Sequence, residues 1–279
     1  MTAESRETRE TIYFVADAHL GSEREPLEGS KRADLRAFLE HLEGRASHLY
    51  VVGDLFDFWF EYRRPAPTPH AEILRALSDL AGSGTKVRFI GGNHDYWAGS
   101  QLEQLTGATV HRGPLHETHF GRRLFIAHGD GLPAGDWGYR ALKAVIRSRP
   151  AIAGFRLVPP GIGAAIARWA SGLSEVTEER VERALPPMMD FLEHVLQSDC
   201  DVAIVAHVHR PVLKRFRSGT AVVIGDWMVH RSVVALDGDG VTMLRWCEGG
   251  LVEVESERNL PVPAAHSRGR SDVSCGCRD

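Results

Sequence analysis

Five short polar clusters, each directly after a hydrophobic run, constrain the fold of this chain more than any other feature. The clusters are Asp17-Ala18-His19, Gly53-Asp54, Gly92-Asn93-His94-Asp95, His128-Gly129-Asp130 and His207-Val208-His209. The run before each cluster is rich in β-branched and aromatic residues, which is typical of a buried strand. In open α/β sheets the carboxyl ends of the strands form the crevice where ligands bind. We therefore expect the five clusters to meet at one edge of the protein.

The segments between the first runs have helical periodicity. Residues 32–43 and 70–82 repeat apolar side chains at three- and four-residue spacing, which places them on one face of a helix. From about residue 220 the pattern changes to successive strands, two of which flank the turn Asp237-Gly238-Asp239-Gly240 and are expected to form a hairpin. Alternating strands and helices favour parallel strands covered by helices, so we predict an α/β fold with two packed mixed sheets.

The stretch between the fourth and fifth clusters has no clear strand. Helical periodicity runs through residues 136–147, 161–173 and 177–197. We interpret about residues 132–198 as a helical insertion, a cap that lies over the strand ends. Pro186-Pro187 should break or kink its last helix, because proline lacks a backbone donor and clashes with the preceding turn.

The two ends of the chain differ from the rest in composition. Residues 252–279 are rich in proline, serine and charge, so we expect a disordered tail after a domain that spans 8–251. The first ten residues are polar and charged and lack the apolar core of a signal peptide. These features favour a cytoplasmic location.

The net charge, the length of the apolar runs and the cysteine spacing argue against several classes of protein. The net charge is −4 over 279 residues, which gives no reason to expect nucleic-acid binding. No stretch of about 18 apolar residues is present, so no span of the membrane is expected. The four cysteines lack zinc-ligand spacing, which fits a reducing compartment. Nothing in the sequence calls for an obligate protein partner.

The clusters supply the donors that divalent cations such as Mn²⁺ accept, namely carboxylate, amide and imidazole groups. The candidate ligands are Asp17, His19, Asp54, Asn93, His128, His207 and His209. Asp54 has two oxygens and is the natural bridge between two ions. Only two of the seven ligands are anionic, so a pair of divalent ions, which we expect to be Mn²⁺, would leave the site positive toward phosphate. Such a centre favours hydrolysis of a phosphorus–oxygen bond.

Two further expectations concern geometry. If Asp17-x-His19 and His207-x-His209 are extended, both side chains of each pair point the same way, and Ala18 and Val208 face the core. His94 is expected to donate a hydrogen bond or a proton to the leaving oxygen, with Asp95 or Asp57 orienting it. Taken singly, each cluster would also fit an ordinary turn. Their common position after five strands favours the catalytic interpretation.

These five clusters, in this order, resemble the calcineurin-like metallophosphoesterase superfamily over about residues 11–236. The resemblance implies a four-layer α/β/β/α sandwich with a dinuclear metal site. The segments GDLFDFWFEYR, HGDGLPAGDWGYRALKAVIR, ARWASGLSE and HVHRP are further similar to UDP-2,3-diacylglucosamine hydrolases of lipid A synthesis. Two departures are His94, where the best-known branch has arginine, and Ala206-His207-Val208-His209, where Gly-His-Thr-His is usual.

The narrower resemblance implies a nucleotide-lipid substrate, UDP-2,3-diacylglucosamine, which is split into UMP and 2,3-diacylglucosamine 1-phosphate. It implies Asp136 and Ser174 as substrate-binding residues and a cap that helps to hold the acyl chains. A doubly acylated substrate also implies peripheral contact with the inner face of the inner membrane. Two alternatives stay open: a metallophosphoesterase for another nucleotide, phosphodiester or phosphoprotein, and a non-enzymatic scaffold with this fold. An apolar pocket beneath the cap would favour the lipid substrate, and an open polar cleft would favour the other phosphoesterases.

Overall fold

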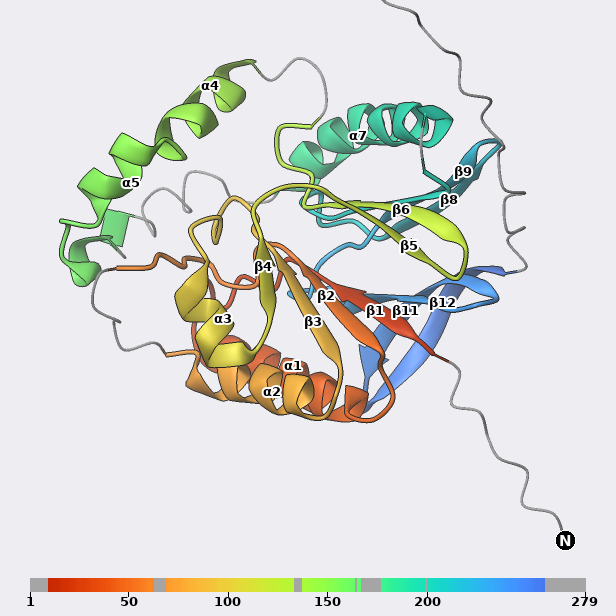
Figure 1. Cartoon of the computed structure of the whole chain (residues 1–279), viewed down its shortest axis with the longest axis horizontal. Coiled ribbons are helices and arrows are strands. Elements are labelled where there is room, and N and C mark those ends of the chain that lie inside the picture. Colours follow the sequence, from red (N-terminus) through yellow and green to blue (C-terminus); the bar gives the residue numbers. More distant parts are fainter. Residues whose placement is uncertain are drawn as a thin grey trace, which may run out of the picture.

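Two β-sheets packed face to face form the body of the protein (Figure 1). The computed structural model describes residues 10–62, 69–132, 137–163, 165–166, 177–198 and 200–258. The seven-stranded sheet has the order β12 (Gly250–Arg258), β11 (Gly240–Cys247), β10 (Ser232–Leu236), β1 (Ile12–Val15), β2 (His48–Val52), β3 (Lys86–Ile90) and β4 (Thr109–His111). The five-stranded sheet has the order β5 (Leu115–His119), β6 (Arg122–Ala127), β7 (Val202–Val205), β9 (Gly219–Val223) and β8 (Val212–Phe216).

Helices cover the outer faces of both sheets, which confirms the four-layer sandwich (Figure 1). On the seven-stranded sheet lie α1 (Leu27–Leu42), α2 (Ala71–Gly82) and the short α3 (Ser100–Thr106). On the five-stranded sheet lies α7 (Glu178–Ser198). Three apolar clusters result, one under each helical layer and one between the sheets.

The helical faces are those that the periodicity predicts. In α1, Leu35, Phe38 and Leu42 are fully buried, and in α2 the same is true of Ile73 and Leu80. Burying each such side chain contributes about 1.5–3 kcal/mol, so these stripes fix how the helices sit on the sheet.

Sheet topology brings the strand ends together. Strands β1, β2, β3 and β4 run parallel in one sheet, and β6, β7 and β9 run parallel in the other. The five polar clusters follow β1, β2, β3, β6 and β7. They therefore leave the sandwich from the carboxyl ends of strands in both sheets. The expected hairpin is also confirmed, because β10 and β11 pair in antiparallel register.

The structure contradicts two expectations for the later part of the chain, a break of its last helix at the two prolines and a tail that begins at residue 252. Helix α7 runs without interruption through Pro186 and Pro187. Both prolines are exposed, as are Glu182 and Arg183 four residues before them, so water can satisfy the carbonyl groups that lose a donor. The tail does not begin at residue 252, because β12 continues to Arg258 and pairs with β11. Alternation of valine and glutamate in this segment is the pattern of a strand, and it outweighs the polar composition.

The predicted cap is divided in the structure. Helix α7 belongs to the body, since Met188, Leu192 and Leu196 are buried against the five-stranded sheet. Helices α4 (Trp137–Ile146) and α5 (Arg149–Phe155) lie to one side of the sandwich (Figure 1). Most of the predicted helix 161–173 and the tail from residue 259 lie outside the described residues. Among the described helices, none has both the length and the apolar character to cross a membrane.

Candidate metal centre

Six of the seven predicted metal ligands lie at one edge of the sandwich, in three overlapping groups of three residues. Within each group, the candidate ligand atoms are all within 4.8 Å of one another. The groups are Asp17, His19 and His209; Asp54, His128 and His207; and His19, Asp54 and His94. The seventh residue, Asn93, joins the second group, with its Oδ1 3.1 Å from His128 Nε2. Two adjacent clusters, each with a carboxylate and two imidazoles, match the donor set of a pair of divalent cations.

Many of the predicted metal ligands have a left-handed backbone conformation. Eight non-glycine residues in the described part of the chain have positive φ, and five of these are predicted ligands. They are Asp17 (50°), His19 (42°), Asp54 (52°), His207 (68°) and His209 (61°). The prediction of extended ligand pairs is therefore wrong, although the interposed Ala18 and Val208 are buried as expected. Such conformations cost about 1–3 kcal/mol each and cluster at functional sites, so this strain is an independent mark of the site.

Hydrogen bonds between neighbouring loops hold these conformations. The backbone N–H of Asp17 donates to the carbonyl oxygen of Gly53 at 3.1 Å, and that of His19 donates to Asp54 at 3.0 Å. The loops also approach too closely for a side chain at Gly92, where a Cβ would lie 2.1 Å from Asp54 Oδ1. Glycine at this position is therefore a requirement of the packing.

Several buried polar atoms of the first group have no hydrogen-bond partner. Asp17 Oδ1, His19 Nε2 and His209 Nδ1 are all in this condition. His19 Nε2 lies 3.8 Å from Asp17 Oδ1 and 3.8 Å from Asp54 Oδ2. An unpaired buried polar atom costs about 1–3 kcal/mol, and a cation among these atoms would remove that cost. The residues present therefore fit a bound metal.

His128 is oriented by the main chain. Its Nδ1 lies 2.9 Å from the carbonyl oxygen of Val52, which can only accept, so Nδ1 donates. Its Nε2 then faces Asp54 Oδ2 at 3.2 Å. Burial lowers the pKa of His128, but Asp54 and Asp17 raise it to about 10. The carboxylates of Asp54 and Asp17 therefore favour a positive charge next to His128 Nε2. A bound cation could supply that charge in place of the proton.

The other imidazoles are held in the neutral form. Burial lowers the pKa of His19, His207 and His209, and for His207 it reaches about 4. At neutral pH these rings therefore offer a lone pair, which metal coordination requires.

His94 and Asp57 lie together, as predicted. The Nδ1 of His94 is 2.8 Å from the backbone carbonyl oxygen of Asp57 and 3.6 Å from its Oδ1. The backbone N–H of His94 donates to Asp54 Oδ1 at 2.8 Å. The ring stands edge-on to His19, with the two centroids 4.7 Å apart. His94 thus borders the candidate metal groups with its Nδ1 already engaged.

Asp95 does not orient His94. Its carboxylate is fully buried and accepts hydrogen bonds from the backbone N–H groups of Gly92 and Leu55, both at 2.8 Å, and from Asp54 at 3.2 Å. The structure therefore contradicts the expectation that Asp95 orients His94, because its carboxylate joins two ligand loops instead. Asp side chains in turns commonly accept hydrogen bonds from nearby backbone N–H groups.

Two charged residues near the site, Lys31 and Asp130, had no predicted role of this kind. Lys31 is fully buried, and its Nζ donates to the carbonyl oxygen of His19 at 2.9 Å. Asp130 is buried two residues after His128 and forms ion pairs with Lys143 of α4 and with Arg147, the residue after that helix. The position of Asp130 in the fourth cluster was a signal for it. Lys31 lies in an ordinary helical turn, so its sequence gives no such signal.

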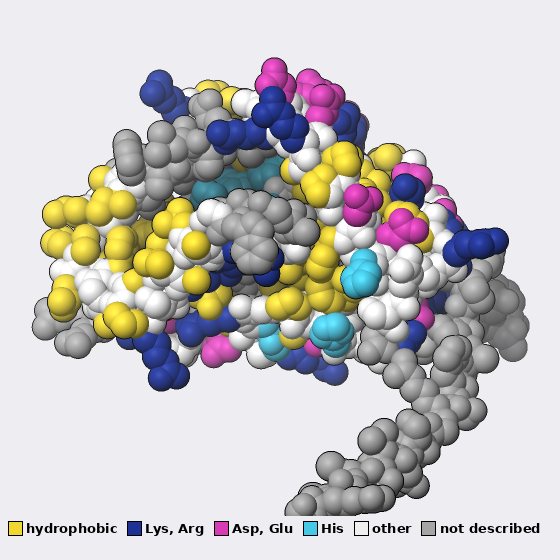
Figure 2. Space-filling model, turned by 90° about the horizontal axis from the view of Figure 1, so that it is seen from above, with side chains coloured by type: hydrophobic (Ala, Val, Ile, Leu, Met, Phe, Trp, Pro, Cys, Tyr) yellow, Lys and Arg dark blue, Asp and Glu magenta, His cyan; other side chains and the backbone are white. Residues whose placement is uncertain are grey.

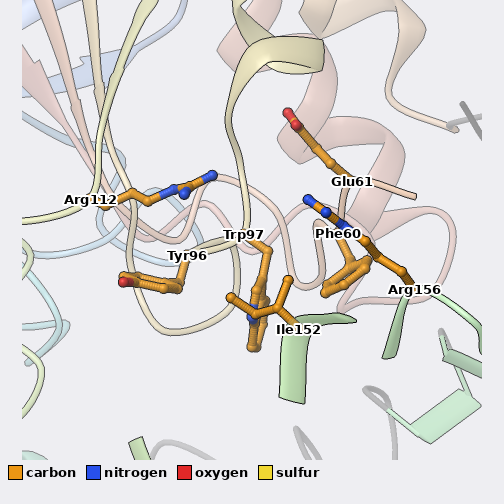
Figure 3. Close-up of a pocket in the computed structure, with 7 residues that line it drawn as sticks. All are labelled: Phe60, Glu61, Tyr96, Trp97, Arg112, Ile152 and Arg156. Atoms are coloured by element: carbon orange, nitrogen blue, oxygen red, sulfur yellow. The ribbon is translucent and has the colours of Figure 1, made fainter. Parts of the chain in front are cut away.

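A small pocket of about 40 Å³ lies between the body and α5 (Figure 3). Its wall combines aromatic and aliphatic side chains with two arginines and one glutamate. The lining residues are Phe60, Glu61, Tyr96, Trp97, Arg112, Ile152 and Arg156. Asp136 and Ser174, the predicted substrate-binding residues, lie outside the described residues.

The chain is similar to known phosphoesterases along most of its length. The family model described as Calcineurin-like phosphoesterase matches residues 10–213. The UDP-2,3-diacylglucosamine hydrolase of Aeromonas salmonicida is 32% identical over 232 residues, covering 80% of this chain and 89% of that protein. The hydrolase of the same name from Aeromonas hydrophila is 31% identical, with 80% and 93% covered. That from Stenotrophomonas maltophilia (strain K279a) is 29% identical, with 82% and 96% covered.

Proposed function

The chain belongs to the calcineurin-like phosphoesterase family, and on that premise we propose that it hydrolyses the diphosphate of UDP-2,3-diacylglucosamine to UMP and 2,3-diacylglucosamine 1-phosphate. The observation that carries the proposal is similarity along nearly the whole of hydrolases with that name, 89–96% of their length. A similarity of this extent includes the segments around the ligand clusters as well as the clusters themselves.

Two divalent cations, which we propose to be Mn²⁺, would be held by the clustered donors. One would be held by Asp17, His19, Asp54 and His209, and the other by Asp54, Asn93, His128 and His207. Bound there, such ions polarise a phosphoryl oxygen and lower the pKa of water. The orphaned atoms of Asp17, His19 and His209 support this assignment.

The residues of the chain itself supply positioning and a proton. Because Nδ1 of His94 is directed at the Asp57 carbonyl, we propose that its other ring nitrogen, Nε2, meets the diphosphate. We propose that Nε2 donates a hydrogen bond to a phosphoryl oxygen, or a proton to the oxygen of the departing lipid phosphate. Asp57 holds the ring in place, and Asp95 keeps the two loops on either side of it at a fixed separation.

The surface around the pocket in Figure 3 is where we propose that the lipid part of the substrate makes contact. Trp97, Phe60 and Ile152 present apolar surface there, and Arg156 lies at its edge. The pocket is too small to enclose an acyl chain, so we propose contact along this surface.

We further propose peripheral contact with the inner face of the inner membrane, from the cytoplasmic side, through α4 and α5. Leu142, Val145 and Ile146 are 57%, 63% and 39% exposed on α4. Residues 137–163 contain five Lys or Arg and no Asp or Glu. Figure 2 shows hydrophobic side chains gathered at the end of the molecule that carries these helices, beside a hollow with histidine at its floor. Apolar and basic groups together suit an anionic lipid surface.

The test of the reaction is direct. The protein is incubated with Mn²⁺ and UDP-2,3-diacylglucosamine in detergent micelles, and UMP is measured; bis(p-nitrophenyl) phosphate serves as a soluble phosphodiester. UMP formation that is abolished by Asn93→Ala supports the proposal. Turnover of the soluble diester without any UMP would assign the chain to another phosphoesterase class. Inactivity on both would favour the non-enzymatic scaffold.

The membrane contact has its own test. Wild type and Val145→Glu are sedimented with vesicles of phosphatidylethanolamine and phosphatidylglycerol. We expect the wild type to bind and the variant to bind at least about tenfold more weakly, because an exposed apolar anchor has been replaced by a charge. Equal binding of the two proteins would contradict the assignment of this surface.

A further inference from the structure

Arg147 joins the part of the predicted cap formed by α4 and α5, here called the cap, to the rim of the metal centre. It follows directly after α4, and its Nη2 donates to the carboxylate of Asp130 at 2.8 Å and to the carbonyl oxygen of Gly92 at 3.1 Å. Its guanidinium carbon also lies 3.8 Å from the centre of the Tyr96 ring. One side chain therefore contacts the loops that follow β3 and β6, the loops that carry Asn93 and His128.

The contacts of Arg147 are shielded from water, which makes them stronger than a surface ion pair. Its side chain is 14% exposed and that of Asp130 is 6% exposed. Lys143, one turn earlier on α4, reaches the same carboxylate at 2.7 Å and the Asp130 carbonyl oxygen at 2.7 Å.

Arg147 also lies directly before the cap of α5. The next residue, Ser148, caps α5, and its side chain accepts a hydrogen bond from the backbone N–H of Ala151. Ile152 and Arg156, which line the pocket in Figure 3, lie within the following nine residues. Fixing Arg147 to the rim therefore fixes the register of the helix that forms one wall of the pocket.

We propose that Arg147 is a positioning residue that couples the cap to the metal centre, setting the distance between the pocket wall and the loops that hold Asn93 and His128. The inference rests on the proposed function, because this distance matters for a substrate that contacts the surface around the pocket and the centre together. Arginine is needed, since a single planar guanidinium makes two directed hydrogen bonds and a ring contact at once. Lysine would keep the charge without that geometry.

The test compares wild type with Arg147→Gln, Arg147→Lys and a control, Arg183→Gln. Arg183 is 82% exposed on α7 and pairs with Glu179 on its own helix. Two readouts are used: the kcat/KM ratio of UDP-2,3-diacylglucosamine to bis(p-nitrophenyl) phosphate, and hydrogen–deuterium exchange of residues 137–156. For both Arg147 variants we expect the ratio to fall at least about tenfold, through KM for the lipid, and exchange of α4 and α5 to rise. The control should match wild type in both.

Each outcome decides the matter. Loss of both activities in equal proportion, with unchanged exchange, would overturn the proposal, because Arg147 would then act on the centre alone. Restoration by Arg147→Lys would show that charge suffices and would overturn the geometric argument. If the wild type does not hydrolyse the lipid, the proposed function fails, and the exchange data alone decide whether Arg147 holds the cap. A thermal melt of each variant confirms that it is folded.

Discussion

The Nδ1 of His94 lies 2.8 Å from the backbone carbonyl oxygen of Asp57, closer than the 3.6 Å that separates it from the Asp57 carboxylate. The main chain therefore contributes more to the orientation of this ring than the acidic side chain does. A main-chain acceptor cannot be removed by substitution, so the two residues should respond differently to mutation.

His94→Gln should lower kcat for UDP-2,3-diacylglucosamine by about 10²–10⁴-fold, the usual contribution of a positioned proton donor. Asp57→Asn should cost no more than about tenfold, because the carbonyl that holds Nδ1 is retained. Steady-state kinetics with Mn²⁺ measures both, and metal analysis of each variant provides the control. An equal loss in the two variants would contradict the orienting role of the main chain.

Asp95→Asn should act on stability more than on chemistry. The carboxylate accepts three well-placed backbone hydrogen bonds, and an amide would turn a donor toward at least one of these donors. We expect the free energy of unfolding to fall by about 3 kcal/mol, as for other buried charge-assisted hydrogen bonds. Urea denaturation followed by circular dichroism gives the value. An unchanged midpoint together with lost activity would restore a catalytic role for Asp95.

Chelation should lower the thermal midpoint. Without cations the buried carboxylates of Asp17 and Asp54 repel each other, and Asp17 Oδ1 and His19 Nε2 stay unpaired. A ligand bound only by the native state at 100 times its Kd adds about 2.7 kcal/mol, so re-addition of Mn²⁺ should raise the midpoint by several degrees. Asp54→Ala should show no such rise. A midpoint that is indifferent to metal in the wild type would count against the centre.

The gathering of the ligands could be predicted because it depends only on strand direction. Once β1, β2, β3, β6 and β7 are buried strands, their carboxyl ends must face the same edge, and the polar residues after them must meet. The left-handed backbone of Asp17 and His207 could not be predicted in this way. It is imposed by contacts between loops, such as the bond from Asp17 to Gly53, which no local pattern encodes.

Local rules also failed where tertiary contacts decide the outcome. Pro187 is tolerated in α7 because the buried face of the helix, with Leu192 and Leu196, anchors it to the sheet while the prolines face water. Strand β12 forms because β11 offers an edge for pairing, although its glutamates suggested a tail. Assignment of α7 to the body likewise required the packing of Met188, since its periodicity alone fits either a cap or a layer.

Acid should destabilise the fold through His70, away from the metal groups. His70 is 6% exposed, its ring lies tilted against that of Phe56 with the two centroids 5.0 Å apart, and burial lowers its pKa from 6.5 to about 4. Between these two values the unfolded chain binds a proton that the folded chain does not, so stability falls as pH decreases from 6.5 to 4 and is unaffected by this residue above 6.5. The full effect is about 3 kcal/mol.

We therefore expect His70→Gln to cost stability at pH 8 and to cost less, or even to stabilise, at pH 4.5. Urea unfolding at both pH values measures the difference, with His194→Gln on the exposed side of α7 as the control; a His70 variant whose deficit is the same at both pH values would show that the ring is not the acid-sensitive group.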